Sequence, residues 1–215
     1  MHPDELTVIY ADDALLVLDK PAGLLSVPGR GEDKQDCLSA RAQAQYPDAL
    51  VVHRLDMGTS GLIVMARGAA AQRVLNQAFA SRSVGKRYVA VVDGQLAPPS
   101  QSWGVIDLPI MVDWPQRPRR IIDCQLGKPS VTHWRVLSHN ASDGTTRIEL
   151  EPLTGRSHQL RVHLLALGHA IVGDALYGSA RVHAMANRLL LHACSLELSH
   201  PVTAQPMRFV STEDF

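Results

Sequence analysis

Short apolar runs bounded by turn residues dominate the hydrophobic pattern of this chain. Short runs of apolar or alternating positions between Gly, Pro, Asn and Asp are typical of β-strands. An Asp12-Asp13 turn is expected to join the first two strands, and the stretch 98–120 is expected to be irregular because it holds several prolines. The strands are predicted over the ranges 8–10, 15–18, 51–53, 62–66, 86–92, 131–137, 146–150, 189–198 and 207–210.

Helical spacing is confined to a few segments. The pattern predicts helices over 36–46, 69–81 and 157–167. Asp36 is a plausible N-cap of the first helix, and Gly168 is a favoured residue after the end of the third. The second helix is expected to have one apolar face, formed by Val74, Leu75, Ala78 and Phe79.

Many strands, few helices and no regular βαβ alternation favour the α+β class. We expect a mixed, largely antiparallel central β-sheet flanked by helices and loops. The chain has 215 residues, which is enough for a substantial core, and it contains no internal repeat.

Charge is balanced overall but not along the chain. Twenty-one basic and 21 acidic residues give a net charge of zero. The range from Arg54 to His163, however, contains 14 Lys and Arg and 8 Asp and Glu. The rest of the chain contains 7 basic and 13 acidic residues. A basic middle could present a positive face to phosphates. The alternative is that folding mixes the two signs.

Cysteine usage and hydropathy indicate a cytoplasmic protein. Three widely spaced cysteines, Cys37, Cys124 and Cys194, form neither a metal pair nor a paired disulfide set. No apolar run reaches the roughly 18 residues that span a bilayer. The first residues are acidic, unlike the basic start of a signal peptide.

A carboxylate between two apolar segments is the first candidate for chemistry. Asp56 follows Val51-Val52, with Arg54 two residues before it and a Gly- and Ser-rich turn after it. Functional side chains often lie on loops held by a rigid scaffold. Without further context, a lone Asp in such a turn is more often a turn residue.

Three other segments are candidates as partners of Asp56. Arg156 precedes a predicted helix, and an arginine near a helix N-terminus could hold a carboxylate in its ionised form through a bidentate pair. A nucleophilic carboxylate must be ionised. Tyr88 of Lys86-Arg87-Tyr88 starts a strand and is, on its own, most often a core residue. Leu191 lies in a segment that by itself reads as a buried strand.

Together these segments resemble the RluA family of pseudouridine synthases, which rearrange uridine in RNA. HRLD followed by GTSGL resembles the catalytic signature of the family. LDKPAGL, K-x-Y, GRSHQLRVH and LLLHA occur in the family's order over nearly the whole chain. The resemblance implies the pseudouridine synthase fold, an RNA-binding active-site cleft and an isomerisation that requires no cofactor and no metal.

The resemblance also implies roles for individual residues. Asp56 is the nucleophile and Arg156 pairs with it. Tyr88 stacks on the target uracil and is the candidate base, and Leu191 lines the uracil pocket. Arg54 is expected to fill the space left when the target base leaves its stack, although it could instead be a surface arginine paired with an acid. Lys20 and Pro21 are expected to brace the active-site strand.

RNA is the expected partner. The segments 24–30 and 107–120 resemble family members of dual specificity, which modify 23S rRNA and the anticodon stem-loop of tRNA. We expect one catalytic domain over 1–215, without an N-terminal S4-type domain, acting as a monomer. Phosphate contacts are predicted for a basic set, which comprises Lys86, Arg117, Arg119 and Arg120, with Arg82 and Arg87 beside Lys86.

The sequence leaves two alternative functions open. An RNA chaperone with a degenerate site would have broken motifs, whereas Asp56, Tyr88 and Arg156 are present. A metal-independent nuclease would use His158 or His192 as its acid–base residue. The five-residue spacing of His158 and His163 does not fit a helical zinc pair.

Overall fold

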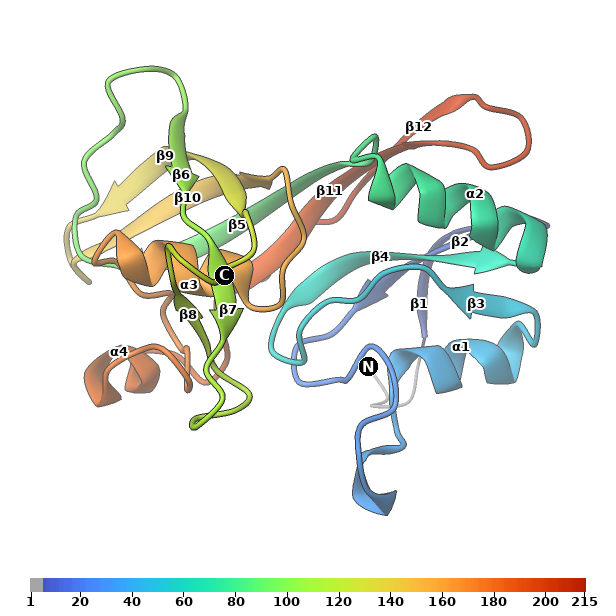
Figure 1. Cartoon of the computed structure of the whole chain (residues 1–215), viewed down its shortest axis with the longest axis horizontal. Coiled ribbons are helices and arrows are strands. Elements are labelled where there is room, and N and C mark those ends of the chain that lie inside the picture. Colours follow the sequence, from blue (N-terminus) through green and yellow to red (C-terminus); the bar gives the residue numbers. More distant parts are fainter. Residues whose placement is uncertain (1–5) are drawn as a thin grey trace. The chain divides into compact units, whose positions relative to one another are not determined.

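The protein is described by a computed structural model that covers residues 6–215 (Figure 1). Part of the acidic start of the chain, residues 1–5, lies outside the described residues. The chain divides into two compact units. Unit 1 is formed by the residues up to Lys86 and by Ala193–Asp214, and unit 2 by Arg87–His192 with Phe215. No helix of the described part is long and apolar enough to cross a membrane.

Unit 1 contains a β-sheet with helices beside it. Its strands run in the order β1-β2-β4-β11-β12, and β3 also pairs with β4. The pairs β1–β2, β2–β4, β3–β4 and β11–β12 are antiparallel. The elements are β1 (Thr7–Ala11), β2 (Leu15–Lys20), the 3-10 helix η1 (Glu32–Lys34), α1 (Leu38–Gln45), β3 (Ala49–Val51), β4 (Ser60–Arg67), α2 (Ala69–Ala80), β11 (Leu191–Ser199) and β12 (Pro206–Val210).

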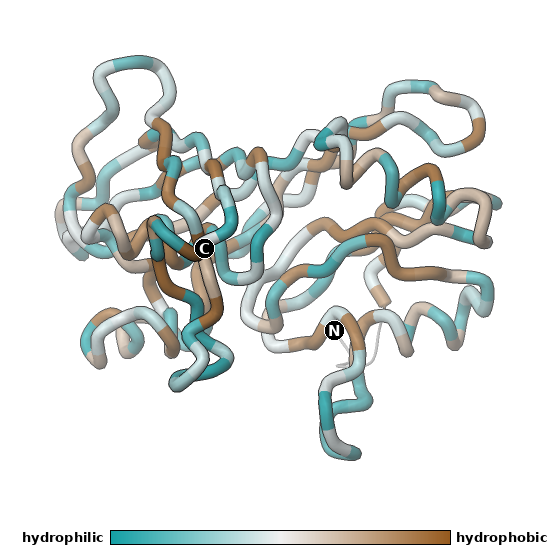
Figure 2. Tube along the Cα trace, viewed as in Figure 1, coloured by the Kyte–Doolittle hydropathy of each residue, from teal (hydrophilic) through white to brown (hydrophobic). Residues whose placement is uncertain are grey.

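The two central strands of unit 1 form its core. β2 and β4 are buried along almost their whole length, which explains why both read as continuous apolar runs. Figure 2 shows the hydrophobic stretches of these strands. Helix α2 adds Ala71 and Leu75 to the same cluster. The β2–β4 pair is therefore a rigid support for the loop that precedes β4.

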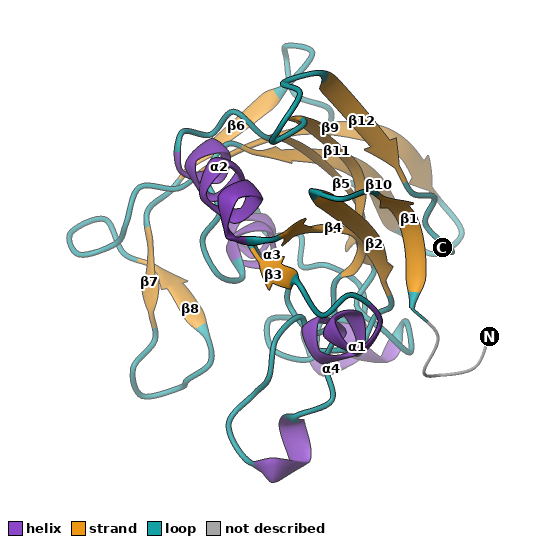
Figure 3. Cartoon of the chain, turned by 90° about the vertical axis from the view of Figure 1, so that its right-hand side faces the viewer, coloured by secondary structure: helices purple, strands orange, loops and turns teal. Residues whose placement is uncertain are grey.

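In unit 2, four strands pair antiparallel in the order β5-β10-β9-β6, and β7 and β8 form a separate antiparallel hairpin. Leu160 and Leu164 of α3 pack into a buried cluster with Ile148 and Leu150 of β10. Figure 3 distinguishes helices, strands and loops. The elements are β5 (Gly85–Asp93), β6 (Gly104–Asp107), β7 (Ile110–Val112), β8 (Arg120–Ile122), β9 (Val131–Asn140), β10 (Thr145–Pro152), α3 (Gln159–Ala166) and α4 (Ala180–Ala184).

The expected α+β class with antiparallel pairing is confirmed, but several element boundaries were wrong. The strand before the signature ends at Val51, so His53 lies outside it. The stretch 98–120 is not wholly irregular, because it contains β6 and β7 and reaches the start of β8. Helix α4 was not expected. Short strands between prolines and a five-residue helix carry too few periodic positions to be recognised from the sequence.

The helix ends also differ from expectation. Asp36 does not cap α1, because Cys37 occupies the N-cap position and the Asp36 carboxylate pairs with Arg41 at 2.6 Å. Val74 is 48% exposed and does not belong to the buried face of α2. Helix α3 begins at Gln159, since His158 has a left-handed conformation with φ 59°.

Candidate active site

A buried lysine fixes the loop that carries Asp56 through hydrogen bonds to backbone carbonyls. Lys20, at the end of β2, has no exposed surface. Its Nζ donates to the carbonyl oxygens of Pro21 and Leu24 at 2.8 Å and of Met57 at 3.1 Å. The amide of Gly23 donates to the same Met57 oxygen at 2.8 Å. Lys20 therefore joins the loop after β2 to the loop of Asp56.

Leu55 anchors the other side of Asp56. Its side chain is 5% exposed. Its backbone exchanges two hydrogen bonds with the Ser26 hydroxyl, which donates to the Leu55 oxygen at 2.7 Å and accepts from the Leu55 amide at 3.1 Å. Asp56 is half-buried, its carbonyl accepts from Thr59 at 3.1 Å, and Arg54 is exposed. The backbone of Asp56 is thus held on both sides.

Lys86 belongs to unit 1 and lies in a partly desolvated environment. Burial, followed by the positive charge of Arg82, lowers the pKa of Lys86. The nearby His53 accepts a hydrogen bond from the Val64 amide at its Nε2 (2.9 Å) and stacks on Phe79, with ring centroids 4.5 Å apart. Burial and the charge of Lys86 lower the pKa of His53 to about 3. The His53 ring is therefore neutral near pH 7, and its Nε2 can accept the hydrogen bond from the Val64 amide.

Tyr88 and Leu191 both belong to unit 2, because the division between the units falls within β5 and β11, and both contact the same hydrophobic cluster. Tyr88 lies on β5 opposite Leu150 of β10 and is half-buried. Its side chain packs against the buried cluster that contains Leu191, which is 3% exposed. Two residues distant in sequence, both predicted for the uracil pocket, are brought together in this way.

A buried glutamine determines the shape of the Arg156 loop. Gln159 is 3% exposed, and its Oε1 accepts from the Arg156 amide at 2.9 Å and from the Thr154 hydroxyl at 2.8 Å. Its Nε2 donates to the Val131 oxygen and the Thr132 hydroxyl oxygen, both at 3.0 Å. Arg156 itself is exposed. The sequence prediction missed Gln159, although its place at the helix start was a possible signal.

Tyr177, also missed, links the Arg156 loop to the β7–β8 hairpin. Its ring is 6% exposed. The phenol oxygen accepts from the Arg120 amide at 2.8 Å and lies 2.7 Å from Nδ1 of His158. Because the Arg120 amide can only donate, the phenol proton is available to His158, whose Nδ1 then accepts. Burial raises the pKa of Tyr177, so the phenol keeps that proton.

An ion pair supports Tyr177 from α3. Arg161 is 7% exposed and binds the fully buried Asp174 through two hydrogen bonds of 2.7 Å. Burial raises the pKa of Asp174, but the Arg161 hydrogen bond and charge and the amides of Leu176 and Tyr177 outweigh burial and lower it. The Arg161 guanidinium also lies 4.9 Å from the Tyr177 ring centroid. The signal in the sequence was a lone arginine among the apolar residues of this helix.

The three predicted hairpin arginines differ in exposure. Arg117 is exposed, and its guanidinium lies 4.1 Å from the Trp114 ring centroid. Arg119 is half-buried over Tyr177 at 5.5 Å. Arg120 is half-buried and fixed through its amide to Tyr177. Arg117 is thus the most accessible of the three.

The one histidine of α3, His163, has structural partners. His163 has no exposed surface, and its nitrogens lie 2.9 Å from the Thr132 hydroxyl and 3.0 Å from the Leu108 carbonyl. Over residues 6–215 no group of three or more His, Cys, Asp or Glu is placed to hold a metal ion. The three cysteines are free thiols.

Comparison with known proteins assigns this chain to a class of enzymes. Residues 14–166 match the family described as RNA pseudouridylate synthase. The human RNA Pseudouridylate Synthase Domain Containing 1 superposes with a TM-score of 0.81 and 30% identity, over 100% of this chain and 87% of that one. The fold and the family match are thus those of RNA pseudouridylate synthases.

Bacterial relatives narrow the assignment. The chain is 50% identical over 210 residues to the dual-specificity RNA pseudouridine synthase RluA of Escherichia coli strain K12, covering 98% of this chain and 94% of that protein. Identity to RluA of Yersinia pestis is 47%, over 98% of this chain and 100% of that protein. The chain belongs to the RluA family of RNA pseudouridine synthases, which are isomerases.

Proposed function

We propose that this synthase converts uridine to pseudouridine with Asp56 as the nucleophile. The N1–C1′ bond of the target uridine breaks, the detached uracil turns, and a C5–C1′ bond forms, so that no atoms or electrons are exchanged with a cofactor. The observation that carries the proposal is the anchoring of Asp56 on both sides, through Lys20 at Met57 and through Ser26 at Leu55. A nucleophile acts best when its backbone is fixed before substrate binds.

We further propose that Tyr88, Leu191 and Arg156 complete the reaction site. Tyr88 would stack on the uracil and accept the C5 proton, with Leu191 beside it, which their shared hydrophobic cluster supports. Arg156 would hold the Asp56 carboxylate in its ionised form. Support for this role is that Gln159 fixes the Arg156 backbone while the side chain stays exposed.

The target base must leave its stack to reach a half-buried carboxylate. We propose that Arg54, exposed next to the anchored Leu55, occupies the vacated space. Lys86 and the hairpin arginines Arg117, Arg119 and Arg120 would contact RNA phosphates. Arg117 would contribute most, because it is the most exposed of the three.

The proposed substrates are 23S rRNA and the anticodon stem-loop of tRNA. The RluA proteins of E. coli and Y. pestis carry dual specificity in their names, and the matches cover nearly the whole chain. We propose that residues 1–215 work as a single catalytic domain, since the family match includes parts of both units. We also propose that the protein is a cytoplasmic monomer that needs no cofactor.

Pseudouridine mapping tests this proposal. Total rRNA and tRNA lacking the modification are incubated with the wild type and with Asp56→Asn, then labelled with carbodiimide and read as reverse-transcription stops. We expect stops only with the wild type, and unchanged folding of the variant by circular dichroism. Near wild-type turnover by Asp56→Asn, with deamidation excluded, would remove Asp56 as the nucleophile.

The same incubation separates the other two functions. A nuclease shortens the RNA, whereas an isomerase leaves its length unchanged. An RNA chaperone binds RNA and produces no stops with either protein.

A further inference from the structure

An exposed tryptophan occupies the tip of the β7–β8 hairpin. Trp114 is 60% exposed, whereas Trp134 is 8% exposed and Trp103 is half-buried, with the guanidinium groups of Arg87 and Arg135 within 4.6 and 4.8 Å of its ring centroid. A tryptophan offers one of the largest apolar surfaces of any side chain, and leaving it in water forgoes the favourable burial of that surface. Trp114 therefore has the large exposed apolar surface that is expected of a residue that binds a partner.

The hairpin tip holds Trp114 in a defined position. The Asp113 amide donates to the Arg119 oxygen at 3.1 Å, and the Asp113 carboxylate accepts from the Gln116 amide at 3.2 Å. Arg117 lies over the Trp114 ring at 4.1 Å and donates to the Trp114 carbonyl at 3.4 Å. A side chain ordered before binding loses less entropy when a partner arrives.

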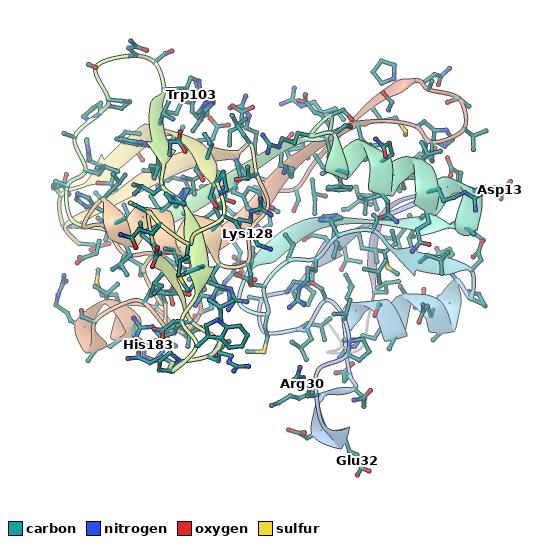
Figure 4. All side chains as sticks on the ribbon, in the orientation of Figure 1. Asp13, Arg30, Glu32, Trp103, Lys128 and His183 are labelled. Atoms are coloured by element: carbon teal, nitrogen blue, oxygen red, sulfur yellow. The ribbon has the colours of Figure 1, made fainter. Side chains whose placement is uncertain are left out.

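The base of the hairpin is attached to the rest of unit 2. The Arg120 amide donates to the buried Tyr177 phenol. Ile110 exchanges two backbone hydrogen bonds with Lys128, an exposed residue labelled in Figure 4. The tip is thus carried on a fixed support, in the same unit as Tyr88 and Arg156.

Charge indicates the kind of partner. Between Ile110 and Ile122 there are three arginines and one aspartate. The Nε atom of Arg119 is buried and has no hydrogen-bond partner among the described residues. An aromatic face amid arginines is the arrangement by which proteins bind unpaired bases of single-stranded or looped RNA.

We propose that Trp114 stacks on an unpaired base of the substrate RNA, while Arg117 and its neighbours bind the flanking phosphates. The inference deepens the proposed function, since it concerns how the substrate is held. Stacking reads no base edge and is tolerant of sequence. This contact therefore suits an enzyme proposed to act on both rRNA and tRNA.

Binding to an isolated stem-loop substrate tests the inference. We expect Trp114→Ala to raise the dissociation constant by about 5- to 150-fold, the range found for loss of one stacked base. Trp114→Phe should retain part of the affinity, because a smaller ring still stacks. The control is Leu126→Ala in the same unit, which removes a 75% exposed apolar side chain and should leave affinity unchanged.

A scan with abasic nucleotides identifies the stacked base. Each loop nucleotide is replaced in turn by an abasic ribose, and both the wild type and Trp114→Ala are titrated. At the stacked position the two proteins should bind equally, because the partner of Trp114 is gone. RNA should also quench tryptophan fluorescence less in Trp114→Phe than in the wild type.

Several results would overturn the inference. One is a dissociation constant of Trp114→Ala within about twofold of wild type, the result expected if the tip binds another protein. A second is a scan in which no abasic position removes the effect of the substitution. If wild type forms no pseudouridine but still binds RNA through Trp114, the proposed function fails and the stacking contact stands. If wild type forms pseudouridine and Trp114→Ala binds normally, only the inference fails.

Discussion

At the scale of single residues, the position of Asp56, the proposed nucleophile, depends on two buried neighbours, Lys20 and Ser26. Lys20 is completely buried, and its ammonium group is surrounded by three backbone carbonyls. Ser26 binds both polar groups of the Leu55 backbone. Such supporting contacts hold a reactive group within the narrow range of positions that catalysis requires.

The phenol of Tyr88 is the group to test for proton transfer. Tyr88→Phe keeps the ring and its packing against the cluster of β5 and β10, but it removes the hydroxyl. We expect RNA affinity to stay near wild type and turnover to fall by about 100-fold or more, since general-base catalysis contributes about that much. Single-turnover kinetics measure both quantities. Normal turnover by Tyr88→Phe would assign the base to another residue.

His53 should make stability depend on pH. Its pKa is about 3 in the folded protein, whereas an unfolded histidine has a pKa of about 6.5. Between these values only the unfolded state binds the proton, so stability is lost as pH falls below about 6.5, by at most about 1.4 kcal/mol per pH unit.

Urea unfolding at pH 7.5 and pH 5.5 provides the measurement for His53. We expect His53→Gln, whose amide oxygen can accept from the Val64 amide, to lose less stability between the two pH values than wild type does. His183→Gln, at an exposed position of α4 labelled in Figure 4, is the matched control. Equal losses in wild type and His53→Gln would show that His53 does not cause the pH dependence.

At the scale of elements, the second glycine of the GTSGL motif has a packing role. Gly61 starts the β4 ladder opposite Lys20, with φ +106°, and a Cβ there would lie 2.4 Å from the carbonyl oxygen of Ala193 on β11. The two strands could not approach so closely with any other residue. The motif therefore serves the strand pairing as well as the Asp56 loop.

Gly61→Ala should destabilise the protein strongly. Left-handed strain alone costs about 1–2 kcal/mol, and the clash with the β11 backbone adds to it. Gly68→Ala is the matched control, because Gly68 has φ +81° but no atom within 4 Å of its Cβ position. We expect Gly61→Ala to have a clearly lower urea midpoint than Gly68→Ala. Similar midpoints would mean that β4 and β11 move apart at little cost.

At the scale of the whole molecule, RNA binding depends on where charge lies rather than on its total. The chain has zero net charge, yet the range from Arg54 to His163 has 14 basic and 8 acidic residues. Affinity for a polyanion follows the number of phosphates contacted. A neutral protein can therefore still show strong salt dependence.

Neutralising the hairpin tests this dependence. We expect Arg117→Gln/Arg119→Gln/Arg120→Gln to weaken RNA binding and to reduce the slope of log Kd against log salt by up to about 2, at roughly 0.7 per lost contact. The control, Arg73→Gln on the exposed side of α2, should keep the wild-type slope. An unchanged slope in the triple variant would exclude the hairpin from phosphate binding.

Most strands and the α+β class could be predicted from the sequence, because alternating or continuous apolar runs are a local signal. Leu15–Leu18 and Leu62–Ala66 were recognised in this way, and both lie inside observed strands. Asp36 and Val74 were assigned wrongly. An ion pair with Arg41 replaced the expected cap, and only neighbouring elements decide which face of a helix is covered.

By itself, the sequence determined the order of the motifs, the family, and the identity of Asp56, Tyr88 and Arg156 as candidates, because motifs are contiguous along the chain. Tertiary structure alone decided which carbonyls Lys20 binds to hold the Asp56 loop, that Gln159 binds Val131 of β9, and that Tyr177 joins the hairpin to His158. Up to 57 residues separate the partners in these contacts. Such contacts form only when the sheets and helices bring distant segments together, so no local pattern encodes them.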